Sequence, residues 1–139
     1  MTVQEVKEKL NSVRTKYREY VLARDKAEQF CAMISAPTLV QSGEPRSEHS
    51  GNAAENKIVA ALWYSEEVDK RFRAYILASQ TVEGMISELK YYDQREVLTR
   101  RYIMFEKWND IQKKMHISRT RLFRLHDRAI IEMVTKKET

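Results

Sequence analysis

Residues 108–122 read WNDIQKKMHISRTRL, and this stretch decides the fold of the C-terminal third of the chain. Ile111 and Met115 are four residues apart, which is the spacing of one face of a helix. The pattern therefore predicts a short helix over about 106–115. Ile117 follows as an apolar residue that can anchor a turn in the core. A short helix, a sharp turn and a second helix together make a helix-turn-helix.

Two polar residues mark the turn and the start of the second helix. His116 stands at the turn, and histidine enters the left-handed backbone region more readily than most residues. Ser118 can cap a helix over about 119–134, because its hydroxyl accepts hydrogen bonds from the free amide groups of the first turn. Helix-turn-helix sequences usually have a small residue at the position of Gln112 and glycine at that of His116, so this chain departs from the pattern twice.

The second helix has an apolar face and a basic face. The apolar face comprises Leu122, Leu125, His126, Ala129 and Met133. The opposite face comprises Thr120, Arg121, Arg124, Asp127 and Arg128, with Arg119 and Phe123 at its edges. We expect the apolar face to pack in the core and the basic face to stay open.

The basic face carries side chains suited to reading DNA in the major groove. Arginine can hold guanine O6 and N7 with two hydrogen bonds, and threonine or phenylalanine can touch a thymine methyl group. The candidates for base reading are Arg119, Thr120, Arg121, Phe123 and Arg124. The candidates for phosphate contacts, which fix the register on the duplex, are Lys107, Lys113, Ser118 and Arg128.

The run from Asp93 to Ala129 resembles a group of regulators. Its features are an R-x-V-L-x-x-R-Y-I helix over about 94–104 that Asp93 can cap, a W-x-x-I helix, an I-S cap and an R-L-H-x-x-A ending. Over about 80–135 the chain resembles region 4 of sigma-70-type factors and, more closely, the phage-encoded RinA/ArpU-type transcriptional regulators. The resemblance implies a DNA-binding protein of the bacterial host cytoplasm that activates phage late or packaging genes and contacts host RNA polymerase.

Two long segments before this motif repeat apolar residues every seven positions. The first stripe comprises Val3, Val6, Leu10, Val13, Tyr17, Tyr20, Arg24, Ala27, Cys31 and Ile34. The second comprises Ile58, Leu62, Ser65, Val68, Phe72, Tyr75, Ser79, Val82, Ile86 and Leu89. Spacings of three and four predict two long helices, with Cys31 buried and a break near Ser79–Gly84. The helices pair either as a hairpin within one chain or between the chains of a homo-oligomer.

The segment 35–52, SAPTLVQSGEPRSEHSGN, holds both prolines and two of the three glycines, so it is predicted to be a flexible loop. The chain therefore divides into a long helix (1–34), this loop, a second long helix (53–84) and a helix-turn-helix domain (85–139). The predicted fold class is all-α: a long helical hairpin or coiled coil followed by a sigma region 4-like helix-turn-helix domain.

Charge and composition narrow the classes of function. The 139 residues carry a formal net charge of +5, and residues 91–139 contain twelve Lys and Arg against seven Asp and Glu. This surplus favours a polyanionic partner such as double-stranded DNA. The single cysteine excludes an intrachain disulfide and a multi-cysteine zinc site. No stretch suits a membrane span, and the sequence shows no phosphate loop or nucleophile motif. We therefore expect no enzyme activity, cofactor, metal or membrane contact.

Two other functions fit the same pattern. A small terminase-like subunit, which recognises DNA for packaging, would also join a helix-turn-helix to an oligomerising coil. An adaptor that binds RNA polymerase through its sigma-like end would need no DNA contact of its own. Ring assembly would distinguish the first, and retention of polymerase without DNA binding would distinguish the second.

Overall fold

The computed structural model describes residues 1–35 and 50–138, with side chains for 1–35 and 53–135. Every regular element in these ranges is helical, which confirms the all-α class. The elements are α1 (Val3–Ser35), α2 (Ser50–Ser87), α3 (Tyr92–Leu98), the π-helix η1 (Thr99–Ile103), α4 (Trp108–Met115) and α5 (Arg119–Glu138). The predicted loop 35–52 lies mostly outside the described residues, but its two ends belong to α1 and α2.

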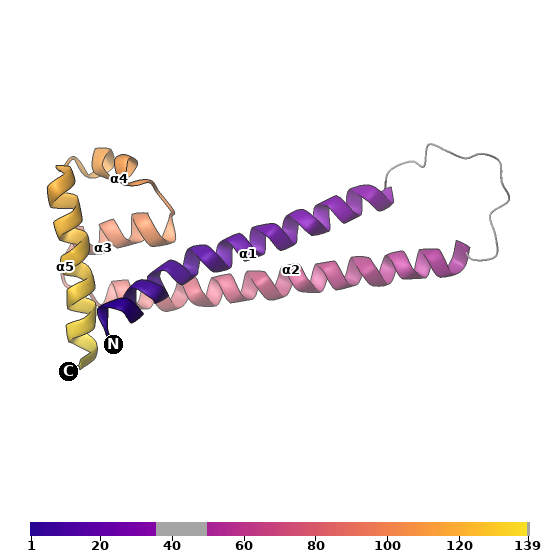
Figure 1. The fold of residues 1–139 in the computed structure, drawn as a ribbon, viewed down its shortest axis with the longest axis horizontal. Helices are drawn as coiled ribbons and strands as arrows, with labels where there is room; N and C mark the ends of the chain where they lie inside the picture. The colour runs from indigo at the N-terminus through magenta and orange to yellow at the C-terminus, as the bar shows by residue number, and fades with distance from the viewer. Residues whose placement is uncertain (36–49, 139) are drawn as a thin grey trace.

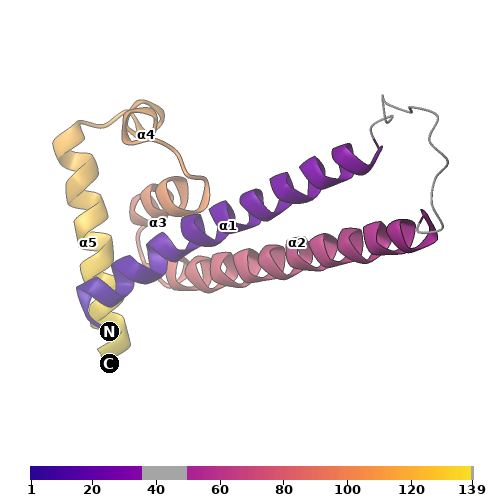
Figure 2. The same ribbon diagram turned by 45° about the vertical axis from the view of Figure 1, so that its right-hand side comes forward.

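Helices α1 and α2 form an antiparallel hairpin, as predicted (Figure 1). Aromatic rings pair across it in antiparallel order, with centroids 5.2 Å apart for Tyr17 and Tyr75, 5.1 Å for Tyr20 and Phe72, and 4.9 Å for Phe30 and Tyr64. We call the end with the N-terminus the base and the opposite end the tip. The two helices lie close together at the base and diverge toward the tip (Figures 1 and 2).

The predicted break in the second long helix is wrong, because α2 runs without interruption through Ser79 and Gly84 to Ser87. Glycine does lower helix propensity, but its neighbours Val82, Met85 and Ile86 are buried in the core. Burial of these apolar side chains stabilises the last turns of α2 and outweighs the cost of one glycine.

A single core at the base joins the hairpin to the C-terminal helices. Its buried apolar members are Val6, Leu10 and Val13 of α1, Val82, Met85, Ile86 and Leu89 near the end of α2, Val97 and Leu98 of α3, Ile111 of α4, and Leu122, Ala129, Ile130 and Met133 of α5. Helix α5 lies across the base and contacts α1 and α3 (Figures 1 and 2). The first turns of α1 are therefore part of the fold that supports the helix-turn-helix.

Toward the tip the two predicted stripes leave the interior. Ile58 is 61% exposed and Leu62 58% exposed, because α1 contacts the neighbouring face of α2 through residues such as Tyr64. Cys31, which we expected to be buried, is exposed. The seven-residue repeat thus predicts burial correctly at the base and fails where the helices diverge.

The helix predicted over 94–104 is two elements. Helix α3 begins at Tyr92, one residue before Asp93, so the predicted Asp93 cap is wrong. The chain then widens into η1, where the amide of Met104 donates to the carbonyl oxygen of Thr99 at 3.0 Å. Phe105 follows with φ 59°, a left-handed value that is costly for an aromatic residue. Its ring lies 5.2 Å from that of Tyr17, and this contact supports the conformation.

Candidate nucleic-acid interface

Helices α4 and α5 and the turn between them form the predicted helix-turn-helix. His116 ends α4 with φ 55° and ψ 44°, the left-handed conformation expected from the sequence. The amide of Ile117 donates to the carbonyl oxygen of Gln112 at 3.4 Å, which closes the turn. The amide of Arg121 donates to Ser118 Oγ at 3.1 Å, so the predicted cap is confirmed. Local hydrogen bonds therefore fix where α5 starts.

The two faces of α5 separate as the helical wheel predicts. Leu122, His126, Ala129, Ile130 and Met133 are buried, and Leu125 is half-buried. The opposite side presents Thr120, Arg121, Arg124, Asp127 and Arg128, all of them exposed. The hairpin lies against the other face and leaves these side chains uncovered.

Three arginines on the open face carry unneutralised charge. Arg121, Arg124 and Arg128 form no ion pair with any residue that the structure describes. The same holds for two of the predicted phosphate contacts, the exposed Lys107 at the start of α4 and the exposed Lys113 in its last turn. Free cations on one side of a short motif create a positive potential that attracts a polyanion.

Arg119 and Phe123 differ from the other candidates because both are held by α4. Arg119 Nη1 donates to Asn109 Oδ1 at 3.3 Å, and its guanidinium lies 5.4 Å from the centre of the Phe123 ring. That half-buried ring packs in turn against Trp108, with centroids 5.0 Å apart. The contacts order Arg119 and turn the ring of Phe123 toward the protein. Asn109 lies in the first turn of α4, nine residues before Ser118, and the sequence carries no local signal for this role.

Glu106 links η1 to α4, a role that the sequence reasoning missed. Its carboxylate accepts from Arg100 Nη1 at 3.1 Å and from Lys114 Nζ at 2.8 Å. Arg100 also donates to Glu96 at 2.8 Å. Burial raises the pKa of Glu106, but the hydrogen bonds from Lys114 and Arg100 outweigh this effect and the pKa is lowered overall. Lys114 is therefore held in an ion pair with Glu106, whereas its neighbour Lys113 forms no ion pair with the described residues.

His126 is a core residue with satisfied hydrogen bonds. Its Nδ1 lies 3.1 Å from Asp127 Oδ1, and its Nε2 lies 2.6 Å from the hydroxyl oxygen of Tyr102. An ionised carboxylate can only accept, so Nδ1 donates to Asp127 and the Tyr102 hydroxyl donates to Nε2. Burial lowers the pKa of His126, Asp127 raises it, and the positive charges of Lys7 and Arg101 lower it further. The ring therefore stays neutral and braces α5 against η1.

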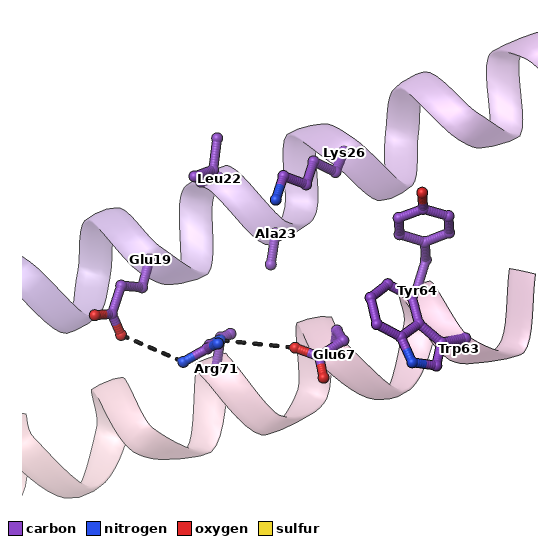
Figure 3. Close-up of a pocket in the computed structure, with 8 residues that line it drawn as sticks. All are labelled: Glu19, Leu22, Ala23, Lys26, Trp63, Tyr64, Glu67 and Arg71. Atoms are coloured by element: carbon purple, nitrogen blue, oxygen red, sulfur yellow. Dashed lines mark ion pairs between the residues drawn. The ribbon is translucent and has the colours of Figure 1, made fainter. Parts of the chain in front are cut away.

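The described residues contain no metal-binding cluster and no membrane-spanning helix. They contain no cluster of three or more His, Cys, Asp or Glu side chains that could hold a metal, and His49 lies outside them. No described helix is both long and apolar enough to cross a bilayer. A notch of about 200 Å³ opens where α1 and α2 diverge (Figure 3). Its Arg71 pairs with Glu19 and Glu67 at 3.6 and 3.8 Å, so its main charges neutralise one another.

Comparison with known protein families finds a match that includes the helix-turn-helix. Residues 50–134 match a family described as a protein of unknown function (DUF1492), and because the match covers more than half of the chain, the chain belongs to that family. The match runs from the start of α2 almost to the end of α5. No curated protein and no solved structure matches the chain. Neither the RinA/ArpU-type regulators nor sigma-70 region 4 is matched, so that resemblance stays a prediction.

Proposed function

We propose that this member of the DUF1492 family is a sequence-specific DNA-binding protein that regulates phage transcription. In this proposal it activates late or packaging genes together with host RNA polymerase. One observation carries the DNA-binding role: Arg121, Arg124 and Arg128 lie exposed and unpaired on a helix that starts at a capped, left-handed turn. The polymerase contact and the activating role rest on the resemblance to sigma-70 region 4 and to the RinA/ArpU-type regulators.

In the proposed mechanism, one set of residues contacts bases and another contacts phosphates. Arg121 and Arg124 reach guanine edges in the major groove, and Arg119 joins them from its place over Phe123. Lys107, Lys113 and Arg128 hold phosphates on either side. The first turn of α5 adds free amide groups, which favour a phosphate near Ser118. The order imposed on Arg119 by Asn109 lowers the conformational entropy that binding costs.

The experiment is a selection from random duplexes, followed by titration of the selected site and a scrambled one at several salt concentrations. Arg121→Ala or Arg124→Ala should lose about 1–3 kcal/mol on the selected site, mostly at one base pair, and little on the scrambled site. Arg18→Ala is the matched control, since Arg18 is an exposed arginine on α1 without an ion pair to the described residues. Equal losses on both duplexes would show that the two arginines read no bases.

The two rival functions predict different results in assays of assembly and of polymerase retention. A small terminase-like subunit would assemble as a ring and bind one packaging site. An adaptor would retain RNA polymerase while it ignores every duplex. No contact among the described residues favours either over direct DNA binding.

A further inference from the structure

The outward face of α2, on the side away from α1, carries a second ordered set of exposed side chains. Positions spaced by three and four along this face are Val59, Leu62, Glu66, Asp69, Arg73, Ile76 and Gln80. Lys70 and Leu77 flank them, as does Trp63, which stands at the edge where it also lines the notch between α1 and α2. Nine of these ten are exposed and Ile76 is half-buried. The large apolar members are mostly uncovered: Val59 is 64%, Leu62 58%, Trp63 56% and Leu77 66% exposed. We call this set the α2 outer face.

The charges in the middle of the α2 outer face have no ion-pair partners in the part of the chain that the structure describes. Glu66, Asp69, Lys70 and Arg73 form no ion pair with a described residue, although Glu66–Lys70 and Asp69–Arg73 have the spacing of helical pairs. Arg71, which faces α1, behaves differently and pairs with two carboxylates. The four charges on the open face thus differ from Arg71 in having no ion pair to the described residues.

Between Leu62 and Leu77, the order of side chains along this face reads the same when the helix is reversed and the charges are exchanged. Counted outward from the midpoint between Asp69 and Lys70, the mirrored pairs are Asp69–Lys70, Glu66–Arg73, Trp63–Ile76 and Leu62–Leu77. Within Leu62–Leu77 each acid therefore mirrors a base and each apolar residue mirrors another, whereas the outermost pair, Val59 and Gln80, does not match. A two-fold contact between identical helices requires this kind of self-complementarity.

We propose that the α2 outer face binds a second copy of this chain, with the two α2 helices antiparallel and a two-fold axis between Asp69 and Lys70. Asp69 then faces the partner's Lys70, and Glu66 faces the partner's Arg73. Leu62 and Trp63 pack on the partner's Leu77 and the partner's Ile76 at both ends of the contact. Exposed ion pairs contribute little energy, so the central charges set orientation and the apolar ends supply affinity.

The test exchanges charges and measures mass in solution by sedimentation. The acidic side is reversed in Glu66→Lys/Asp69→Lys, and the basic side in Lys70→Glu/Arg73→Glu. We expect the unaltered chain to dimerise, each double variant to dimerise more weakly by roughly tenfold or more, and a 1:1 mixture of the two variants to recover a dimer. The fourfold exchange of all four charges restores complementarity with itself and should also dimerise alone.

Three outcomes overturn the proposal. The unaltered chain is a monomer at tens of micromolar, or both double variants dimerise as the unaltered chain does, or their mixture shows no recovery. Circular dichroism of each double variant controls for loss of helix, because like charges at this spacing weaken a helix by themselves. The 1:1 mixture distinguishes loss of helix from loss of complementary charge. A variant whose helix is unfolded would not recover a dimer when the other variant is added. The result does not depend on DNA binding.

Discussion

At the scale of single residues, the interface depends on which cations are free and which are committed. Glu106 engages Arg100 and Lys114, and Asn109 holds Arg119, whereas Lys113 forms no ion pair with the described residues. Lysines and arginines that look equivalent in the sequence therefore have different roles. In the proposed function the free ones meet phosphates and bases, whereas Arg100 and Lys114, which bind Glu106, hold the motif together.

Lys107→Ala should weaken binding to all duplexes alike. Loss of one phosphate contact reduces the magnitude of the slope of log K against log salt by about 0.9. Lys9→Ala, at an exposed lysine of α1 without an ion pair to the described residues, should leave the slope unchanged. A Lys107 variant with an unaltered slope would remove this residue from the phosphate contacts.

His126 should make folding stability depend on pH. Because burial lowers its pKa in the folded state, the unfolded chain binds the proton more tightly. The stabilising effect of the neutral ring is complete above the ordinary histidine pKa of about 6.5 and is lost as the pH falls from there through the lowered folded-state pKa. Urea unfolding of the protein and of His126→Gln between about pH 7.5 and pH 5 measures it. Identical pH profiles for the two proteins would contradict the assignment.

At the scale of elements, local signals in the sequence predict the helix-turn-helix well. Ser118 and His116 fix the turn through hydrogen bonds and a backbone conformation that depend on near neighbours only. The η1 turn depends instead on distant contacts, such as that of Phe105 with Tyr17, and no local signal announces it. The exposure of Ile58 likewise follows from which face of α2 meets α1 toward the tip, and a seven-residue repeat does not encode this choice.

Replacement of the cap should destabilise α5. Ser118→Ala removes the acceptor for the Arg121 amide and should cost about 1 kcal/mol in the free energy of unfolding. Ser12→Ala is the matched control, because Ser12 donates to a carbonyl oxygen inside α1 and caps nothing. Ser118→Asp should restore stability but still weaken DNA binding, since a carboxylate there repels phosphate. Full DNA affinity in Ser118→Asp would argue against a phosphate at this helix terminus.

At the scale of the whole molecule, the hairpin and the helix-turn-helix share one core. Buried residues of α1 and α5 belong to the same apolar cluster, and α5 lies across the base of the hairpin (Figure 2). The long helices therefore pack against the helix-turn-helix at the base, while the outer face of α2 remains exposed. The division into separate segments that the sequence suggests does not anticipate this shared core, because apolar periodicity does not say which distant segments meet.

Leu10→Ala should unfold the helix-turn-helix together with the hairpin. The buried side chain lies in the shared core, and its truncation should cost about 2–5 kcal/mol. Leu22→Ala, at a leucine of the same helix that is 57% exposed, should cost far less. In a Trp63→Phe background the fluorescence of Trp108 reports on α4 alone. If Trp108 unfolds at the same urea concentration in Leu10→Ala as in the unaltered background, the core is not shared.

The arginines of α5 are proposed to contact guanine in the major groove, and methylation protection measures this contact at single bases. Dimethyl sulfate modifies guanine N7, the atom that a bound arginine covers. On a selected duplex the protein should protect individual guanines, and Arg121→Ala or Arg124→Ala should each lose protection at a particular guanine while the others stay covered. A protein that protects no guanine at saturating concentration in dilute buffer, or protection unchanged in both variants, would contradict the account.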